Sequence, residues 1–102
     1  MFFRIVNILH RGREGKRNTP VTDQKYNGMV NSIIKLKNYD SIENIWQFDE
    51  LRFDFIETES DYDFWRSSCV IAISLGYDNL YYIETINTIY VLEEVKDYKW
   101  QE

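Results

Sequence analysis

The chain begins with a run of apolar residues that is typical of a buried strand. Residues 2–9 (FFRIVNIL) are rich in β-branched and aromatic side chains on both alternating faces, interrupted by Arg4 and Asn7. A strand that is apolar on both faces is expected inside a sheet that is covered on each side. Residues 10–21 follow without periodicity and include two glycines and one proline, which predicts a long loop.

Two later segments have features that favour helices. Apolar residues recur at helical spacing after Thr22, a residue type that caps helix N-termini, so a helix is predicted over about 22–37. A second helix is predicted from Ser60 to Leu75. Acidic residues suited to a helix N-terminus follow Ser60, and Gly76 suits the end of a helix. The β-branched residues at its centre, 70–73, argue against this second helix.

Hairpins are predicted in the remaining segments. Residues 42–48 and 51–58 flank Asp49-Glu50, and apolar and charged residues alternate along the second arm. Residues 80–85 and 88–94 flank Ile86-Asn87 and predict a second hairpin. The tail, 97–102, is expected to be loosely held.

The predicted order of elements is β-α-β-β-α-β-β, in a chain of 102 residues that is read as a single domain, 1–102. This order predicts an α+β fold, a ferredoxin-like β-α-β-β-α-β sandwich with an additional C-terminal strand. In that fold an antiparallel sheet carries two helices on one face. The other face would be apolar here, so it is expected to be covered by a partner or by a second copy in a homodimer.

Charge is distributed unevenly along the chain. Residues 1–38 hold eight Lys and Arg against two Asp and Glu, and residues 39–102 hold four against fifteen. The net charge of −5 therefore hides a basic end and an acidic body. This pattern bears on association with charged partners rather than on fold.

The basic loop, residues 10–21, is the first candidate for chemistry. Its cations lie among two glycines that permit close backbone approach, which suits a phosphate ligand. The phosphate-binding candidates are Arg11, Arg13, Lys16 and Arg17. The glycine spacing does not match a P-loop, and a solvated loop or one paired with the acidic body is the favoured interpretation. His10, the only histidine, is a candidate general base for RNA cleavage if this loop holds nucleic acid.

Acidic side chains and one tryptophan make up the second candidate site. A carboxylate field of this kind would speed encounter with a basic, nucleic-acid-binding partner. The proposed partner-binding residues are Asp49, Glu50, Asp54, Glu57, Glu59, Asp61, Asp63 and Trp46. A hard cation would also suit alternating carboxylates, but the segment lacks the glycine turn and distal glutamate of a calcium loop, so no metal is predicted.

Cys69 is the only cysteine, which excludes an internal disulfide and a thiolate zinc cluster. It is read as a small filler of the core within the second helix, beside Trp65 on the same inner face. A reducing, cytoplasmic compartment is expected, and the apolar N-terminal run is too short to span a membrane. One Ala and one Pro beside twelve Ile suggest an A+T-rich coding sequence, as in a low-G+C bacterium, its phages or its mobile elements.

No set of residues assembles a catalytic or cofactor-binding motif, so the sequence favours a non-enzymatic role. The hypothesis is a small acidic inhibitor, of the immunity or anti-defence (anti-CRISPR) type. It would dock on a basic, nucleic-acid-handling partner and block it. The alternative is a nucleic-acid-binding protein or small ribonuclease that uses the basic loop.

Overall fold

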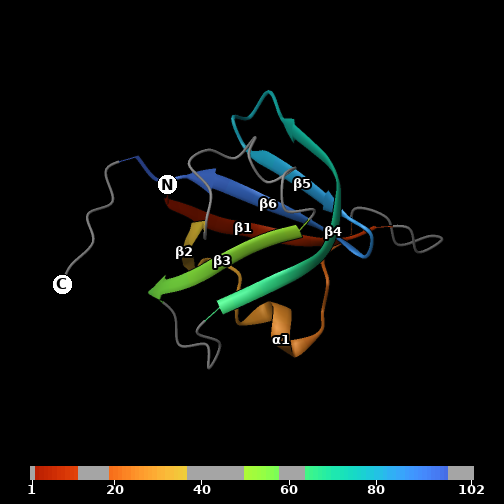
Figure 1. Cartoon of the computed structure of the whole chain (residues 1–102), viewed down its shortest axis with the longest axis horizontal. Coiled ribbons are helices and arrows are strands. Elements are labelled where there is room, and N and C mark those ends of the chain that lie inside the picture. Colours follow the sequence, from red (N-terminus) through yellow and green to blue (C-terminus); the bar gives the residue numbers. More distant parts are fainter. Residues whose placement is uncertain (1, 12–18, 37–49, 58–63, 97–102) are drawn as a thin grey trace.

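The computed structural model of this chain describes residues 2–11, 19–36, 50–57 and 64–96. Six strands and one short helix follow in the order β1 (Phe2–His10), α1 (Gln24–Asn27), β2 (Ile33–Leu36), β3 (Glu50–Glu57), β4 (Phe64–Leu75), β5 (Tyr81–Thr85) and β6 (Thr88–Glu94). Each strand pairs antiparallel with the next, and β6 pairs with β1, so the sheet closes into a barrel (Figure 1).

A β-bulge in β1 keeps the apolar side chains of this strand inside the barrel on both sides of the bulge. The register with β6 shifts between Ile5 and Asn7, where the Asn7 Oδ1 accepts a hydrogen bond of 2.9 Å from the Ile8 backbone N–H. An extra residue reverses the inward and outward faces of a strand. Phe3 and Ile5 before the bulge and Ile8 after it are consequently all buried.

The interior of the barrel is a continuous apolar core. Alternate residues of β3 and β5 are fully buried, among them Phe53 and Ile83, and in β6 all five residues from Thr88 to Leu92 are buried, Tyr90 among them. The segment around α1 lies against one end of the barrel (Figure 1), where Met29 is fully buried and the Tyr26 ring meets the Trp65 ring edge-on at 5.6 Å between centroids. This segment therefore closes that end with apolar surface.

Strand β4 is long because its two halves have different partners. Residues 64–69 pair with β3, and residues 70–75 pair with β5 after a register shift between Val70 and Ala72. In Figure 1 this strand curves strongly along the barrel, and its second half leads into a turn that projects outward. A register shift that bends a strand is the usual way to turn a corner in a small barrel.

The predicted ferredoxin-like sandwich is wrong, since neither predicted helix forms at its expected length. The segment 22–37 contains only the four-residue α1 and then β2. Asn31 adopts a left-handed conformation (φ 72°) and donates a backbone hydrogen bond of 2.7 Å to the Ile5 carbonyl, which ends any helix before that point. The described part of the segment 60–75 is entirely strand, in keeping with its β-branched centre.

Closure of the sheet also removes the open face on which the expected homodimer interface rested. Dimerisation itself stays a prediction. In the part of the chain that the structure describes, no helix is long and apolar enough to cross a membrane.

Other predictions from local pattern are confirmed. The apolar N-terminal run is β1, the second arm of the first hairpin is β3, and β5 and β6 flank Ile86-Asn87 as expected. The Thr85 hydroxyl stabilises that turn by accepting a 3.1 Å bond from the Thr88 N–H and donating a 2.8 Å bond to the Thr88 carbonyl. The predicted strand at 42–48 and the tail at 97–102 lie outside the described residues.

The buried Tyr90 provides a test of this core. Burial raises the pKa of Tyr90 to about 12, from an ordinary value of 10.0. The neutral phenol is therefore favoured by folding, and its contribution to stability is fully present below pH 10 and lost as the pH rises toward and through 12. The free energy of unfolding of the wild type, minus that of Tyr90→Phe, should fall by about 2 kcal/mol between pH 9 and pH 12.

Urea unfolding at the two pH values measures this difference. The remaining tyrosines titrate in both proteins, so their effect cancels in the comparison. An unchanged difference would contradict the placement of the Tyr90 hydroxyl in the core.

Candidate docking site

The turn between β4 and β5 is ordered by hydrogen bonds among its own backbone and side-chain groups. The Gly76 N–H donates to the Leu80 carbonyl at 2.9 Å, and Asn79 adopts a left-handed conformation with φ 63°. The Asp78 carboxylate accepts bonds of 3.0 Å from the Leu80 N–H and 2.7 Å from the Tyr82 hydroxyl. Asp78 therefore organises the turn, as aspartate commonly does two residues before a backbone donor.

The Asp78–Tyr82 hydrogen bond shifts both groups in the expected directions. The Tyr82 hydroxyl and the Leu80 N–H hold the pKa of Asp78 below its ordinary value, because both bonds favour the carboxylate. The same bond to Asp78 raises the pKa of Tyr82, because the phenol must keep its proton to donate. At neutral pH the turn thus carries a full negative charge.

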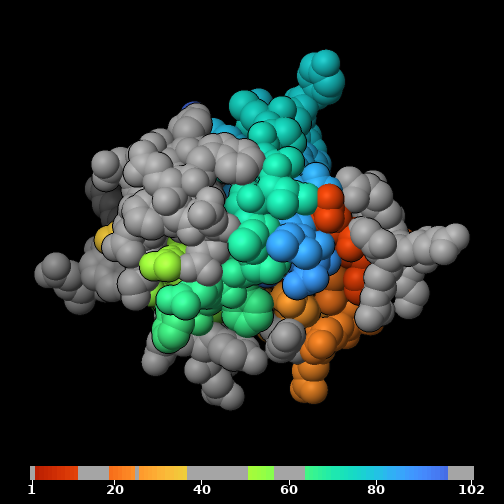
Figure 2. Space-filling view, turned by 45° about the vertical axis from the view of Figure 1, so that its right-hand side comes forward, coloured from red at the N-terminus to blue at the C-terminus, as the bar shows by residue number. Residues whose placement is uncertain are grey.

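The turn and the second half of β4 display apolar side chains to solvent. Tyr77, at its corner, has a relative exposure of 111%, and Leu75, at the end of β4, is 58% exposed. Ile71, further back on the same strand, is 41% exposed. In Figure 2 the end of β4 and the following turn (teal) project from the rest of the surface. Large exposed side chains on an ordered projection are typical of a contact with another protein.

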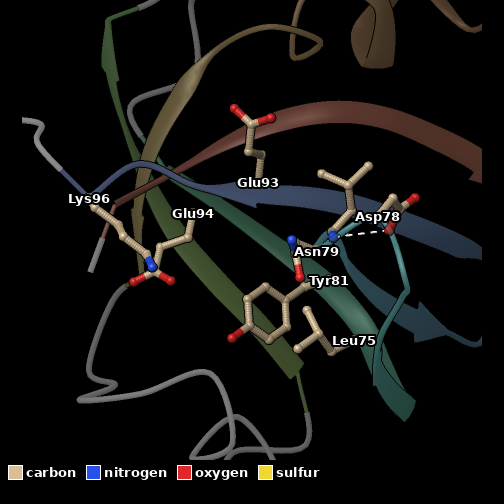
Figure 3. A pocket seen from close by; sticks show the side chains of 8 residues that line it. Leu75, Asp78, Asn79, Tyr81, Glu93, Glu94 and Lys96 are labelled. Carbon is tan, nitrogen blue, oxygen red and sulfur yellow. Dashed lines mark hydrogen bonds between the residues drawn. The ribbon is translucent and has the colours of Figure 1, made fainter.

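A cleft of about 370 Å³ lies beside the projecting turn (Figure 3). The residues that line it come from the end of β4, the turn, the start of β5, and the end of β6 with the residues just after it: Leu75, Asp78, Asn79, Leu80, Tyr81, Glu93, Glu94 and Lys96. Tyr81 lies next to Leu75 across the β4–β5 pair, and its ring packs edge-on against the core residue Phe3 with 5.8 Å between centroids. The apolar part of the cleft is thus anchored to the barrel interior.

The charged part of the cleft is mainly acidic, with three carboxylates against the single ammonium of Lys96. Glu93 and Glu94 extend in opposite directions from β6, as successive strand residues do (Figure 3). Glu93 forms an ion pair with Arg4 of β1. We name Leu75, Tyr77 and the residues lining this cleft the docking site.

Of the predicted acidic partner-binding residues, the structure places the side chain of Asp54 alone. Asp54 is half-buried on the outward face of β3, where its cross-strand partners are Lys35 of β2 and Phe64 of β4. Glu50 and Glu57 are the two ends of β3. Trp46, Asp49, Glu59, Asp61 and Asp63 lie outside the described residues. Asp54 does not line the docking site.

Of the predicted phosphate-binding residues, the structure places Arg11. Its Nε donates to the Glu84 carboxylate at 2.7 Å, and its Nη1 donates to the Ile86 carbonyl at 3.4 Å. Arg11 is therefore tied to the acidic body of its own chain, and phosphate binding by the basic loop as a whole stays a prediction. Arg13, Lys16 and Arg17 lie outside the described residues.

Three other residues were singled out from the sequence. Cys69 is exposed on β4, so its reading as a core residue of a helix is wrong. Trp65 does pack against the core, but from a strand, and its Nε1 donates to the Tyr90 hydroxyl at 2.9 Å. His10 is the last residue of β1, and its backbone N–H donates to the Thr19 carbonyl at 2.8 Å. No cluster of His, Cys, Asp and Glu suited to a metal occurs among the described residues.

Sequence reasoning missed the docking site because it assigned Gly76 to the end of a helix that runs to Leu75. Three of the four residues 76–79 (GYDN) are Gly, Asp and Asn, which is also a turn signal between strands, and that signal could have identified the hairpin. The β5–β6 hairpin, which the sequence did predict, places Glu93 and Glu94 beside the start of β5, where Tyr81 pairs with Leu92.

Comparison with models of protein families, with curated proteins and with solved structures gives no match for this chain.

The packing of Gly76 gives a test of the turn geometry. A Cβ at this position would lie 2.6 Å from the Asp78 Oδ1 and 2.9 Å from the Tyr82 Cε2. To make room, Asp78 and Tyr82 must shift, which disturbs the bond from the Leu80 N–H to Asp78 Oδ1 and the bond from the Tyr82 hydroxyl to Asp78 Oδ2. Gly76→Ala should therefore destabilise the protein by about 1–2 kcal/mol. Chemical unfolding measures the change.

Gly28→Ala is the matched control, because a Cβ there has no neighbour within 4 Å. This substitution should leave the stability unchanged or raise it by up to about 1 kcal/mol. Equal effects of the two substitutions would contradict the described turn.

Proposed function

We propose that this protein is a small acidic protein-binding inhibitor that docks on a basic, nucleic-acid-handling partner and blocks it. It would be of the immunity type or an anti-defence protein of a phage or mobile element. The observation that carries the proposal is the docking site, in which the exposed Leu75 and Tyr77 stand beside a cleft with three carboxylates. A cytoplasmic site of action belongs to the proposal and is supported by the single cysteine.

The two parts of the docking site would have different tasks. Tyrosine is enriched among residues that contribute most to binding energy, because its large rigid body loses little entropy on burial. Carboxylates at the rim mainly increase the rate of encounter with a positively charged partner. A partner surface with Lys or Arg beside an apolar pocket would complement both parts.

Rigidity of the turn supports this role. Asp78 fixes the backbone that carries Tyr77 through bonds to Leu80 and Tyr82. A side chain presented on an ordered turn pays less conformational entropy when a partner binds than one on a loose loop. The turn is therefore suited to insert Tyr77 into a partner without rearrangement.

The alternative function, nucleic-acid binding or RNA cleavage through the basic loop, has less support. The Arg11 guanidinium binds Glu84, which competes with phosphate for the same donors. The predicted acidic set around residues 49–63 stays a prediction, and Asp54 provides a way to separate that set from the docking site.

Capture by matched variants tests the proposal. The full chain is biotinylated at Cys69, which is exposed and lies outside the docking site, and is mixed with nuclease-treated lysate of a low-G+C bacterium. A retained protein with an isoelectric point above 9 is then purified, and its affinity and nucleic-acid activity are measured. Tyr77→Ser should weaken binding at least tenfold, about 1.4 kcal/mol, because it removes an anchoring side chain.

Two control variants, Ile86→Ser and Asp54→Asn, and one further test variant, Glu94→Gln, accompany Tyr77→Ser. Ile86→Ser removes an exposed apolar side chain (51%) from the other hairpin turn and should leave affinity unchanged. Glu94→Gln should lower the association rate and its salt dependence, and Asp54→Asn should not. Retention of no basic protein, equal affinity of Tyr77→Ser and wild type, or a captured partner that keeps its full activity in the complex would contradict the proposal.

A further inference from the structure

The cleft of the docking site lies at one end of the barrel interior. Strand pairing places Leu75 of β4 opposite Tyr81 of β5, and Tyr81 opposite the core residue Leu92 of β6. Glu94 comes two residues after Leu92, so its side chain leaves β6 on the same face as Leu92, and its cross-strand partner on β1 is Phe3. A carboxylate therefore stands at the mouth of the apolar core.

Glu94 differs from the other two carboxylates of the cleft in having no partner within the described part of the chain. Asp78 is hydrogen-bonded inside the turn, and Glu93 forms an ion pair with Arg4. The side chains of Glu94 and Lys96 overlap in the view of Figure 3, yet no ion pair joins these two described residues. Because Glu94 is half-buried, its unpaired charge is incompletely solvated and favours a cation that enters the cleft.

Tyr81 gives the cleft an oriented aromatic wall. Its ring is fixed by the edge-on contact with Phe3, and Figure 3 shows Leu75 beside it. Since Tyr81 is opposite Leu92, it is a diagonal neighbour of Glu94 on the same face, a separation that aromatic and long side chains can span. A guanidinium group suits this pair, because it stacks on an aromatic face and donates two parallel hydrogen bonds to a carboxylate.

We infer that this cleft receives one arginine side chain, with its guanidinium paired to Glu94 and stacked on Tyr81 and its aliphatic stem against Leu75. The inference rests on the proposed function in that the arginine belongs to the basic partner. The volume of about 370 Å³ is at the low end of the roughly 300–1,000 Å³ of enclosing sites, which suits a single side chain. Lysine fits less well, because its compact, strongly hydrated ammonium lacks the planar fork.

NMR titration of the isotope-labelled full chain with N-acetyl-arginine methylamide tests the inference without the partner. The backbone amide signals of the cleft residues in 75–81 and 93–96 should shift as the capped arginine binds. Capped citrulline keeps the shape of the side chain but is neutral, so it should bind about fivefold more weakly. Capped lysine keeps the charge without the planar group and should also bind more weakly than capped arginine.

Variants of the cleft separate its charge from its aromatic wall. Glu94→Gln should weaken binding of capped arginine about fivefold, and Lys96→Met should strengthen it about twofold because a competing cation is removed. Tyr81→Leu should weaken it about threefold and reduce the preference over lysine. Asp54→Asn removes an equal charge outside the cleft and is the control, with affinity unchanged. Thermal unfolding checks each variant, and Glu94→Gln keeps the test valid if Tyr81→Leu does not fold.

Three results would overturn the inference: no shift of the cleft signals, equal affinity for capped arginine and capped citrulline, or an effect of Glu94→Gln no larger than that of Asp54→Asn. Its failure is distinguishable from failure of the proposed function. A captured basic partner that depends on Tyr77, with a cleft that does not bind arginine, contradicts this inference alone. Binding of capped arginine without capture of any basic protein contradicts the proposed function alone.

Discussion

The pairing of β1 with β6 is the constraint on which the rest of the structure depends. It joins residues near the start of the described chain, such as Phe3, to residues near its end, such as Glu94. Without this ladder the sheet would have two open edges and would expose the apolar faces of both strands. The bulge at Ile5–Asn7 is part of the same solution, since it lets β1 keep its apolar residues inside while its partner on the other side changes from β2 to the segment at 19–21.

The same pairing changes the meaning of the uneven charge. Arg4 pairs with Glu93 and Arg11 with Glu84, so both ion pairs join the basic end of the chain to its acidic body. These pairs are partly exposed, so each contributes little to stability, about 0–1 kcal/mol. Their importance is for recognition, because two cations of the basic end are engaged at the surface of β5 and β6.

Strand β4 connects two different parts of the barrel. Its first half carries Phe64 and Arg66 beside β3, and its second half leads to Leu75 and the rigid turn beside β5. A bend between the halves, at the register shift near Val70, directs the docking site away from the face that β3 shares with the first half of β4.

The sequence by itself determined the elements whose pattern is local. The β5–β6 hairpin has its turn residues and both arms within one short segment, Tyr81–Glu94, and β1 and β3 likewise follow from apolar runs and alternation.

 The reason is that a hairpin depends on residues close together in the chain, such as Ile86-Asn87 and the threonines that flank that turn.

Only the tertiary structure decided whether the ambiguous segments became helix or strand. Residues 60–75 have a capping start and a closing glycine that suit a helix, yet the described part pairs with β3 and β5 because those strands offer backbone partners and an interior for Val70. Periodicity cannot register such partners, since they are distant in the chain. For the same reason the facing of Arg52 and Arg66 was set by strand pairing and not by any local pattern. The acidic cleft depends on two consecutive hairpins, β4–β5 and β5–β6, and the sequence predicted only the second, because β4 itself was the ambiguous segment.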